Sequence, residues 1–315
     1  MDSVESMFYF GEVPWHKKGT KLIDIPTSER AIIAAGLDWD VRKEKVYFDD
    51  TLNSKSGCYY SIKNVSAIVR NDKTGAESVL GIVGKRYTPV QNKNAFNFFD
   101  SIVGEKKAIY HTAGSLEDGK IIWILAKLPD GISISGNDEV ELYTLLSNRH
   151  DGKRSLIVQP TPVRVVCNNT LNLALVERKQ RMTFRHTTNI ETQMKMAALS
   201  LNHSLETFSK TKEAYKLIAS KSVDSVKLNE YFEEVLSIEE FSNKKNAKKN
   251  RLVNVFDHDV STNSLNPSLW IAYNAVTYWS DHEKGNSEKR LSNSWFGSGF
   301  AIKQKALDVA IRMAA

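Results

Sequence analysis

The chain has 315 residues, of which 41% are hydrophobic and 25% charged, a composition ordinary for a soluble globular protein with a sizeable core. Its net charge of +6 favours a polyanionic partner without requiring one, and no stretch approaches the ~20 apolar residues of a membrane-spanning helix. The two cysteines, Cys58 and Cys167, favour a reducing cytoplasm over a disulfide framework. Because the sequence contains no phosphate-binding loop, dinucleotide-binding glycine motif or paired metal ligands, we expect neither a cofactor nor a metal.

The first part of the chain predicts strands joined by hairpins, with helices interleaved. Thr27 is placed to cap a helix that ends at Gly36, and a second helix is expected from Gln91 to Val103 because its apolar residues recur with helical spacing. The expected strands are 39–46, 59–69, 79–83, 108–112, 120–128 and 182–186. The segment 121–126 is apolar on both faces, which is typical of a central strand covered on both sides.

The stretch 143–175 combines several structural signals. Asp151-Gly152 lies between two β-rich runs and predicts a hairpin turn. The second run is expected to kink at Pro160 and Pro162. Asn168 or Asn169 is a suitable N-cap for a helix that would follow, with its free N–H groups available to an anion.

From Asn189 onward the sequence predicts helices. The expected helical ranges are 189–208, 226–236, 266–279 and 300–313, with polar segments 243–251 and 281–293 read as loops. Aromatic residues within this and the earlier part, Tyr59, Tyr60, Phe96, Trp270 and Tyr273 among them, are expected in the core. The predicted fold is therefore α+β: a sheet domain over residues 1–188, followed by a helical region over 189–315 that packs on it.

Cations lie just after the strand 79–83, at the hairpin turn and on the strand before the predicted helix N-terminus. They favour a nucleic-acid interface, because Lys and Arg neutralise phosphates and aromatic rings stack on bases. The candidate residues are Lys85, Arg86, Tyr87, Arg149, Lys153, Arg154, Arg164, Asn168 and Asn169. Tyr87 is the preferred stacking ring. A secondary basic patch consists of Lys244, Lys245, Lys248, Lys249 and Arg251. The alternative interpretation is that turn cations are simply solvated or paired with carboxylates.

Three phrases carry a resemblance to a known family: TPVRVVCNNTLNLAL at 161–175, SNRHDGKRSL at 147–156 and GKRYTPVQNKNAFNFFD at 84–100. With them the chain resembles the phage/plasmid-like protein family, whose domain has no known function and whose members come from phages, prophages and mobile plasmids. The resemblance implies an accessory protein of a mobile element in a bacterial host cell. A more distant similarity to phage single-strand annealing proteins implies single-stranded DNA as partner and a homo-oligomer that aligns strands.

The leading hypothesis is thus a non-enzymatic protein that binds single-stranded DNA and promotes annealing or recombination. One alternative is a factor that binds and blocks a host defence or replication protein, through an exposed apolar patch around Trp295, Phe296 and Phe300. A second alternative is a hydrolase centred on Cys167 or on local His-Asp clusters.

Overall fold

The structure of the protein is a computed structural model. It describes residues 4–11, 19–49, 59–72, 75–104, 108–135, 138–164, 169–170, 181–200, 202–237, 243–258, 266–286 and 290–315. The predicted class is confirmed: an α+β fold in which two sheets occupy the N-terminal part and a set of helices, α3 to α9, forms the C-terminal part.

Sheet A has eight strands in the order β10-β9-β8-β7-β6-β1-β2, with β11 also paired to β9. Its strands are β1 Val4–Phe10, β2 Thr20–Leu22, β6 Ile109–Leu116, β7 Ile121–Ser135, β8 Asp138–Arg149, β9 Leu156–Arg164, β10 Asn169–Thr170 and β11 Met182–Phe184. All neighbours are antiparallel except β1 and β2. As predicted, β7 is a central strand, and residues 121–126 are buried on both faces.

Two prolines lie inside β9 at positions where its outer edge has no described neighbour. β11 pairs with β9 at Leu156–Val158 and β10 pairs with it at Val163 and Arg164. Pro160 and Pro162 lie between these two short strands. On that edge no described strand would accept a hydrogen bond from their position, so the missing N–H groups cost nothing there. Where a kink was expected, β9 therefore continues as one strand through both prolines.

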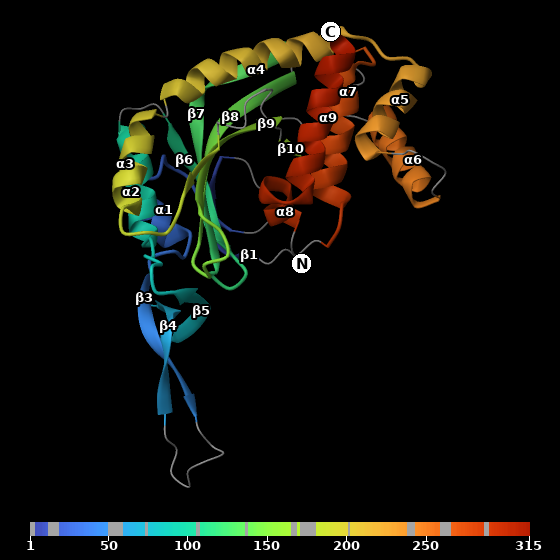
Figure 1. The fold of residues 1–315 in the computed structure, drawn as a ribbon. Helices are drawn as coiled ribbons and strands as arrows, with labels where there is room; N and C mark the ends of the chain where they lie inside the picture. Colours follow the sequence, from blue (N-terminus) through green and yellow to red (C-terminus); the bar gives the residue numbers. More distant parts are fainter. Residues whose placement is uncertain are drawn as a thin grey trace.

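The second sheet projects from the body as a finger, defined here as β3 Asp40–Asp49, β4 Tyr59–Asn71 and β5 Glu77–Gly84. Its order is β3-β4-β5 and all pairs are antiparallel, so the three predicted strands are confirmed. Figure 1 shows the finger extending away from sheet A and the helices. β5 ends where Gly84 pairs with Val65, so the outer part of the finger is a two-stranded ribbon.

The helices are α1 Ser28–Ala34, α2 Asn92–Gly104, α3 Ile190–Ser200, α4 Asn202–Ser220, α5 Ser225–Leu236, α6 Asn243–Asp257, α7 Leu269–Tyr278, α8 Arg290–Phe296 and α9 Ser298–Ala314, with a π-helical turn η3 Trp279–Glu283 after α7. Thr27 caps α1 as predicted, its side chain accepting a hydrogen bond from the Arg30 N–H at 3.3 Å. None of the described helices is both long and apolar enough to cross a membrane.

Three helical predictions were wrong in extent. The helix expected over 189–208 is two helices, α3 and α4. The supposed loop 243–251 is the first part of α6, whose buried Leu252, Val255 and Phe256 lie just beyond the basic run. The supposed loop 281–293 contains the end of η3 and the start of α8.

Sheet A is packed on both faces. The larger core cluster joins one face of the sheet to α1 and α2 and continues to α4, α5, α7 and α9, with Trp270 and Phe96 buried as predicted. The smaller cluster lies on the opposite face, where Trp295 of α8 meets Trp123 of β7 at 5.4 Å between ring centroids. In Figure 1 the sheet stands between α1–α3 on one side and α7–α9 on the other.

Candidate functional site

The turn between β8 and β9 is wedged against the base of the finger. Gly152 adopts a φ of +75°, which favours glycine, and a Cβ there would lie 2.8 Å from a Val83 methyl carbon. A Cβ on Gly81 of β5 would lie 2.6 Å from the Cα of Asp151. The predicted Asp151-Gly152 hairpin turn is therefore confirmed, and its close packing brings residues 149–154 next to residues 81–87.

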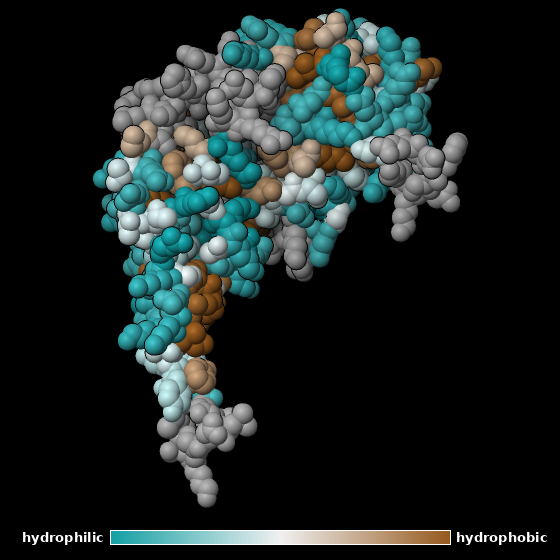
Figure 2. All heavy atoms as spheres, in the orientation of Figure 1, coloured by the Kyte–Doolittle hydropathy of each residue, from teal (hydrophilic) through white to brown (hydrophobic). Residues whose placement is uncertain are grey.

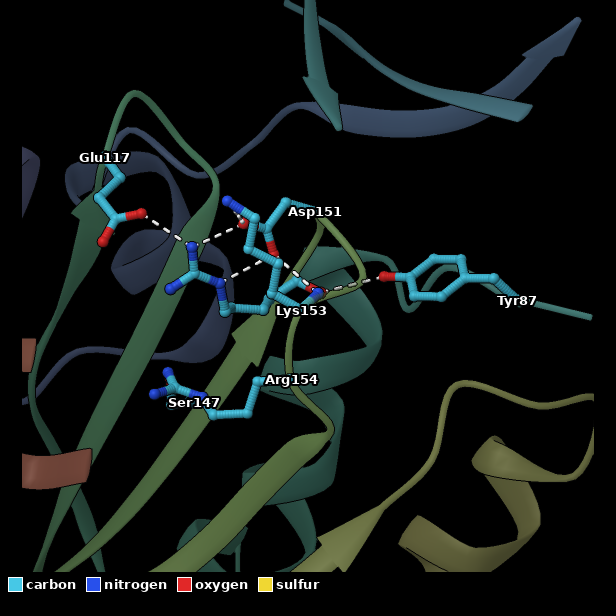
Figure 3. Close-up of polar contacts among 7 residues, drawn as sticks. Tyr87, Glu117, Ser147, Asp151, Lys153 and Arg154 are labelled. Carbon is cyan, nitrogen blue, oxygen red and sulfur yellow. Dashed lines mark hydrogen bonds and ion pairs between the residues drawn. The ribbon is translucent and has the colours of Figure 1, made fainter. Parts of the chain in front are cut away.

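Arg149 is held by two carboxylates. Its guanidinium donates to both oxygens of Asp151, at 2.8 and 2.6 Å, and to Glu117 at 2.8 Å (Figure 3). Burial raises the pKa of Asp151, but the hydrogen bonds from Arg149 and the Lys153 N–H more than offset this and hold it below its usual value. Arg149 therefore links the β6–β7 turn to the β8–β9 turn. Its positive charge is neutralised by these carboxylates.

Arg154 and Arg181 make no ion pair with any described carboxylate. The Arg154 guanidinium lies 3.8 Å from the centroid of the Phe296 ring, and that of Arg181 lies 5.5 Å from the same ring and 5.9 Å from Phe300. Both Nε atoms are buried and lack a hydrogen-bond partner, while an Nη atom of Arg154 reaches the Ser147 hydroxyl at 3.4 Å. In Figure 3 no dashed line joins Arg154 to Glu117 or Asp151.

The electrostatics of this arginine cluster (Arg154 and Arg181) favour an anion. Burial, followed by the positive charges of Arg149 and Arg181, lowers the pKa of Arg154 to about 10, against smaller opposing effects of Glu117 and Asp151. Burial also lowers the pKa of Arg181. A phosphate bound between Arg154 and Arg181 would accept charge-assisted hydrogen bonds from planar guanidinium groups and relieve their mutual repulsion.

Lys85, Arg86 and Lys153 are exposed around the same junction of finger and sheet. The Lys153 side chain is 77% exposed and its ammonium lies 3.8 Å from Asp151. Tyr87 has a structural place instead: its hydroxyl donates to the Arg149 carbonyl at 3.0 Å and its ring stacks on His186, with centroids 4.5 Å apart. Burial raises the pKa of Tyr87, and a ring already stacked and half-buried is poorly placed to receive a base.

The remaining predicted residues lie elsewhere. Arg164 is at the opposite end of β9, paired in register with Val140 and Asn169. Asn169 belongs to strand β10, so the expected helix does not begin there. Asn168 lies outside the described residues. The structure thus joins Lys85, Arg86, Arg149, Lys153 and Arg154 and separates them from Arg164.

The secondary basic patch is on α6, away from this junction. Lys249 pairs with Glu233 at 2.6 Å, and Arg251 pairs with Glu283, its Nε lying 2.8 Å from the carboxylate. Lys248 is exposed. Lys244 and Lys245 are in the helix, but their side chains lie outside the described set.

Aromatic exposure differs from expectation in two places. Tyr59 and Tyr60, expected in the core, are 70% and 51% exposed on the finger, because none of the described strands or helices covers the ribbon there. Trp295, expected in an exposed apolar patch, is buried against Trp123. The patch proposed for a host-protein partner therefore lacks its largest side chain.

The groups considered for hydrolysis form no catalytic arrangement among the described residues: Asp257 and His258 are exposed at the end of α6, and most of the others are buried or paired. His150 is fully buried with its Nε2 3.1 Å from the Asn92 amide oxygen, and burial lowers its pKa to about 3. Asp281 accepts from the buried Lys303 ammonium at 2.8 Å, and Glu283 pairs with Arg251. Cys167 lies outside the described residues. Within the part of the chain that the structure covers, His, Cys, Asp and Glu side chains form no group suited to a metal ion.

Arg181 was missed from the sequence. It ends the run Glu177-Arg-Lys-Gln-Arg181, a basic signal that could have been weighed, but its approach to Arg154 depends on β11 pairing with β9. Taken together, the α+β fold places two arginines without a described carboxylate partner on a largely antiparallel sheet, beside the projecting β finger. The arrangement can bind phosphate groups and has no described catalytic constellation.

The chain belongs to the DUF932 family. The family model, described as a domain of unknown function, matches residues 79–305. This range includes β5 from Val79 onward and the whole arginine cluster, and it leaves out β3 and β4. No curated protein and no solved structure matches the chain.

Proposed function

We propose that this protein is a non-enzymatic accessory protein of a phage or plasmid that binds single-stranded DNA in the bacterial cytoplasm. One observation carries the proposal: Arg154 and Arg181 converge beside Phe296 without a described carboxylate partner. Uncompensated, partly buried cations are unfavourable for folding alone, and an anionic ligand would account for their retention. The three exposed cations at the same junction extend the positive surface over more than one phosphate.

Binding of this kind is electrostatic and does not read sequence. Lys85, Arg86 and Lys153 would neutralise successive phosphates of a strand, while the arginine cluster would hold one phosphate by directed hydrogen bonds. Annealing or recombination would follow if several subunits lined up strands with their base edges free. We therefore expect a homo-oligomer, and light scattering after size-exclusion chromatography measures it.

The test is fluorescence anisotropy of a labelled oligo(dT) over a salt series. Exposed cations are replaced together in Lys85→Gln/Arg86→Gln/Lys153→Gln, and a matched control removes three exposed cations of the helical part, Lys216→Gln/Lys221→Gln/Lys227→Gln. Both variants lose the same net charge. We expect the slope of log K against log salt to become shallower by about 2 in the first variant, from ~0.7 per phosphate contact, and to stay unchanged in the control.

Two outcomes would overturn the proposal. Binding that is absent in the wild-type protein, or equally weakened in both triple variants, would remove the junction as a DNA site. Tighter binding of an oligo(U) of the same length would replace DNA by RNA as the partner.

A further inference from the structure

The outer finger carries exposed aromatic rings that the fold does not use for packing. Tyr47, Phe48, Tyr59 and Tyr60 are 52%, 51%, 70% and 51% exposed. They lie on the part of the finger beyond the end of β5, where only two strands remain. A two-stranded ribbon is marginally stable by itself, so any exposed ring that adds no packing to it requires a reason outside the fold.

The rings divide between the two sides of the ribbon. Phe48 and Tyr60 are directly paired across the strands and stack on each other, with centroids 5.6 Å apart and planes at 28°. This cross-strand pair stabilises the ribbon. On the opposite side lie Tyr47, paired in register with Ser61, and Tyr59, paired with Asp49. Neither ring contacts the ring of another described residue, so their faces are available.

The side of the ribbon that bears Tyr47 and Tyr59 continues towards the junction of finger and sheet, where the arginine cluster lies. The register between β3 and β4 shifts between Lys45 and Tyr47, and the extra residues of this irregularity belong to β4. Because β3 itself continues as one strand, alternation of its side chains puts Lys43 and Lys45 on the same side as Tyr47. The Lys43 ammonium donates to the carbonyls of Lys85 and Tyr87, both at 3.0 Å, which places this side over the cationic junction. Lys45 is exposed beside the rings and makes no ion pair with a described residue. Figure 2 shows the finger projecting from the body.

We propose that Tyr47 and Tyr59 form a base-stacking arm, on which bases of the strand stack while its phosphates pass Lys45, Lys43 and the junction. The inference rests on the proposed function and adds a preference: a ring can stack only on a base that is unpaired, so the arm selects single strands over duplex. A strand of negative charge matches the cations along this side, and bases match the ring faces. Both requirements are met by single-stranded DNA.

The test compares an oligo(dT) with an abasic strand of equal length, which keeps the phosphates and removes the bases. We expect the wild-type protein to bind oligo(dT) at least about tenfold more tightly than the abasic strand. Tyr47→Ala/Tyr59→Ala is expected to abolish this difference while leaving abasic binding and its salt slope unchanged. Tyr47→Phe/Tyr59→Phe keeps the rings and is expected to keep the difference, and Tyr278→Ala removes an exposed tyrosine of α7 as a control.

The outcomes separate the two proposals. Equal wild-type affinity for both strands, or a difference that persists in the double alanine variant, overturns the stacking arm and leaves phosphate binding intact. Binding of neither strand overturns the proposed function itself. Unchanged affinity of the alanine variant for the abasic strand shows that its cationic junction is still folded.

Discussion

Arg154 places its guanidinium carbon 3.8 Å from the centroid of Phe296 and meets no described carboxylate, although Asp151 is only three residues away. Asp151 is occupied by Arg149, which takes both of its oxygens. Arg149 and Arg154, five residues apart, thus differ in whether a carboxylate pairs with them. Arg149 is neutralised within the fold, whereas Arg154 has no described acidic partner.

This difference predicts opposite effects of the same substitution. Arg149→Met leaves the Asp151 carboxylate, whose side chain is 3% exposed, without its main partner, and we expect a loss of about 3 kcal/mol in the free energy of unfolding. Arg154→Met removes an uncompensated charge and keeps contact with Phe296, so we expect the free energy of unfolding to be unchanged or higher. Urea unfolding of both variants measures this, and a larger loss for Arg154→Met would show that Arg154 is a structural residue.

The same substitution at Arg154 is expected to weaken oligo(dT) binding. A charged hydrogen-bonding contact to phosphate contributes about 1.5 to 3 kcal/mol, so affinity should fall by at least about tenfold. Arg154→Lys keeps the charge but not the planar group and should fall between wild type and Arg154→Met. Isothermal titration calorimetry measures all three. Unaltered affinity in Arg154→Met would exclude this arginine from the interface.

The docking of the finger on the β8–β9 turn can be tested with two glycines of β5. Gly81→Ala would place a Cβ 2.6 Å from the Asp151 backbone, and we expect a cost of about 1 to 3 kcal/mol. Gly84→Ala meets nothing within 4 Å and is expected to change the free energy of unfolding by less than about 0.5 kcal/mol. Thermal unfolding of the pair gives the comparison. Equal stability of the two would contradict the close contact.

Acid sensitivity is expected from His150. Burial lowers its pKa to about 3 from an ordinary value near 6.5. Between these two values the unfolded chain binds a proton at His150 and the folded chain does not. Stability is therefore fully present above about pH 6.5 and falls as pH decreases, by about 2 to 3 kcal/mol at pH 4.5. His150→Gln should flatten that part of the pH profile. An identical slope in wild type and variant, measured by urea unfolding, would assign the loss to other groups.

The buried ion pair beneath α8 gives a last prediction on stability. Lys303 is 1% exposed and donates to Asp281 and to the Ser294 hydroxyl, at 2.8 and 2.7 Å. Lys303→Met leaves the buried Asp281 carboxylate without its cation, and we expect the free energy of unfolding to fall by about 3 to 5 kcal/mol. Lys305→Met, near the surface of the same helix, should cost less than about 0.5 kcal/mol. Similar losses in the two variants would argue against the buried pair.

Local signals in the sequence were enough for most of the fold. The Asp151-Gly152 turn was predictable because a tight hairpin needs positive φ, and Thr27 because a hydroxyl can cap a first turn. The basic run at 243–251 was misread because its helix turns its apolar side inward only from Leu252 onward. Asn169 was misread as a helix cap, although Arg164 on β9 offers it a strand partner instead.

The site could be predicted only in part. The cations of the turns were visible, but which of them is neutralised depends on Glu117, which reaches Arg149 from another hairpin. The role of Arg181 depends on its proximity to Phe296, which belongs to the distant helix α8. Tyr59 and Tyr60 have the residue types of a core strand, and only the absence of a covering layer over the described ribbon exposes them.

Amide hydrogen exchange with and without saturating oligo(dT) tests the central claim most directly, because it locates the bound strand along the chain. We predict slower exchange in peptides that cover β3, residues 82–88 and residues 149–156, with no change in α5 and α6. Unchanged exchange at the finger and junction, or protection confined to the basic helix α6, would contradict the account.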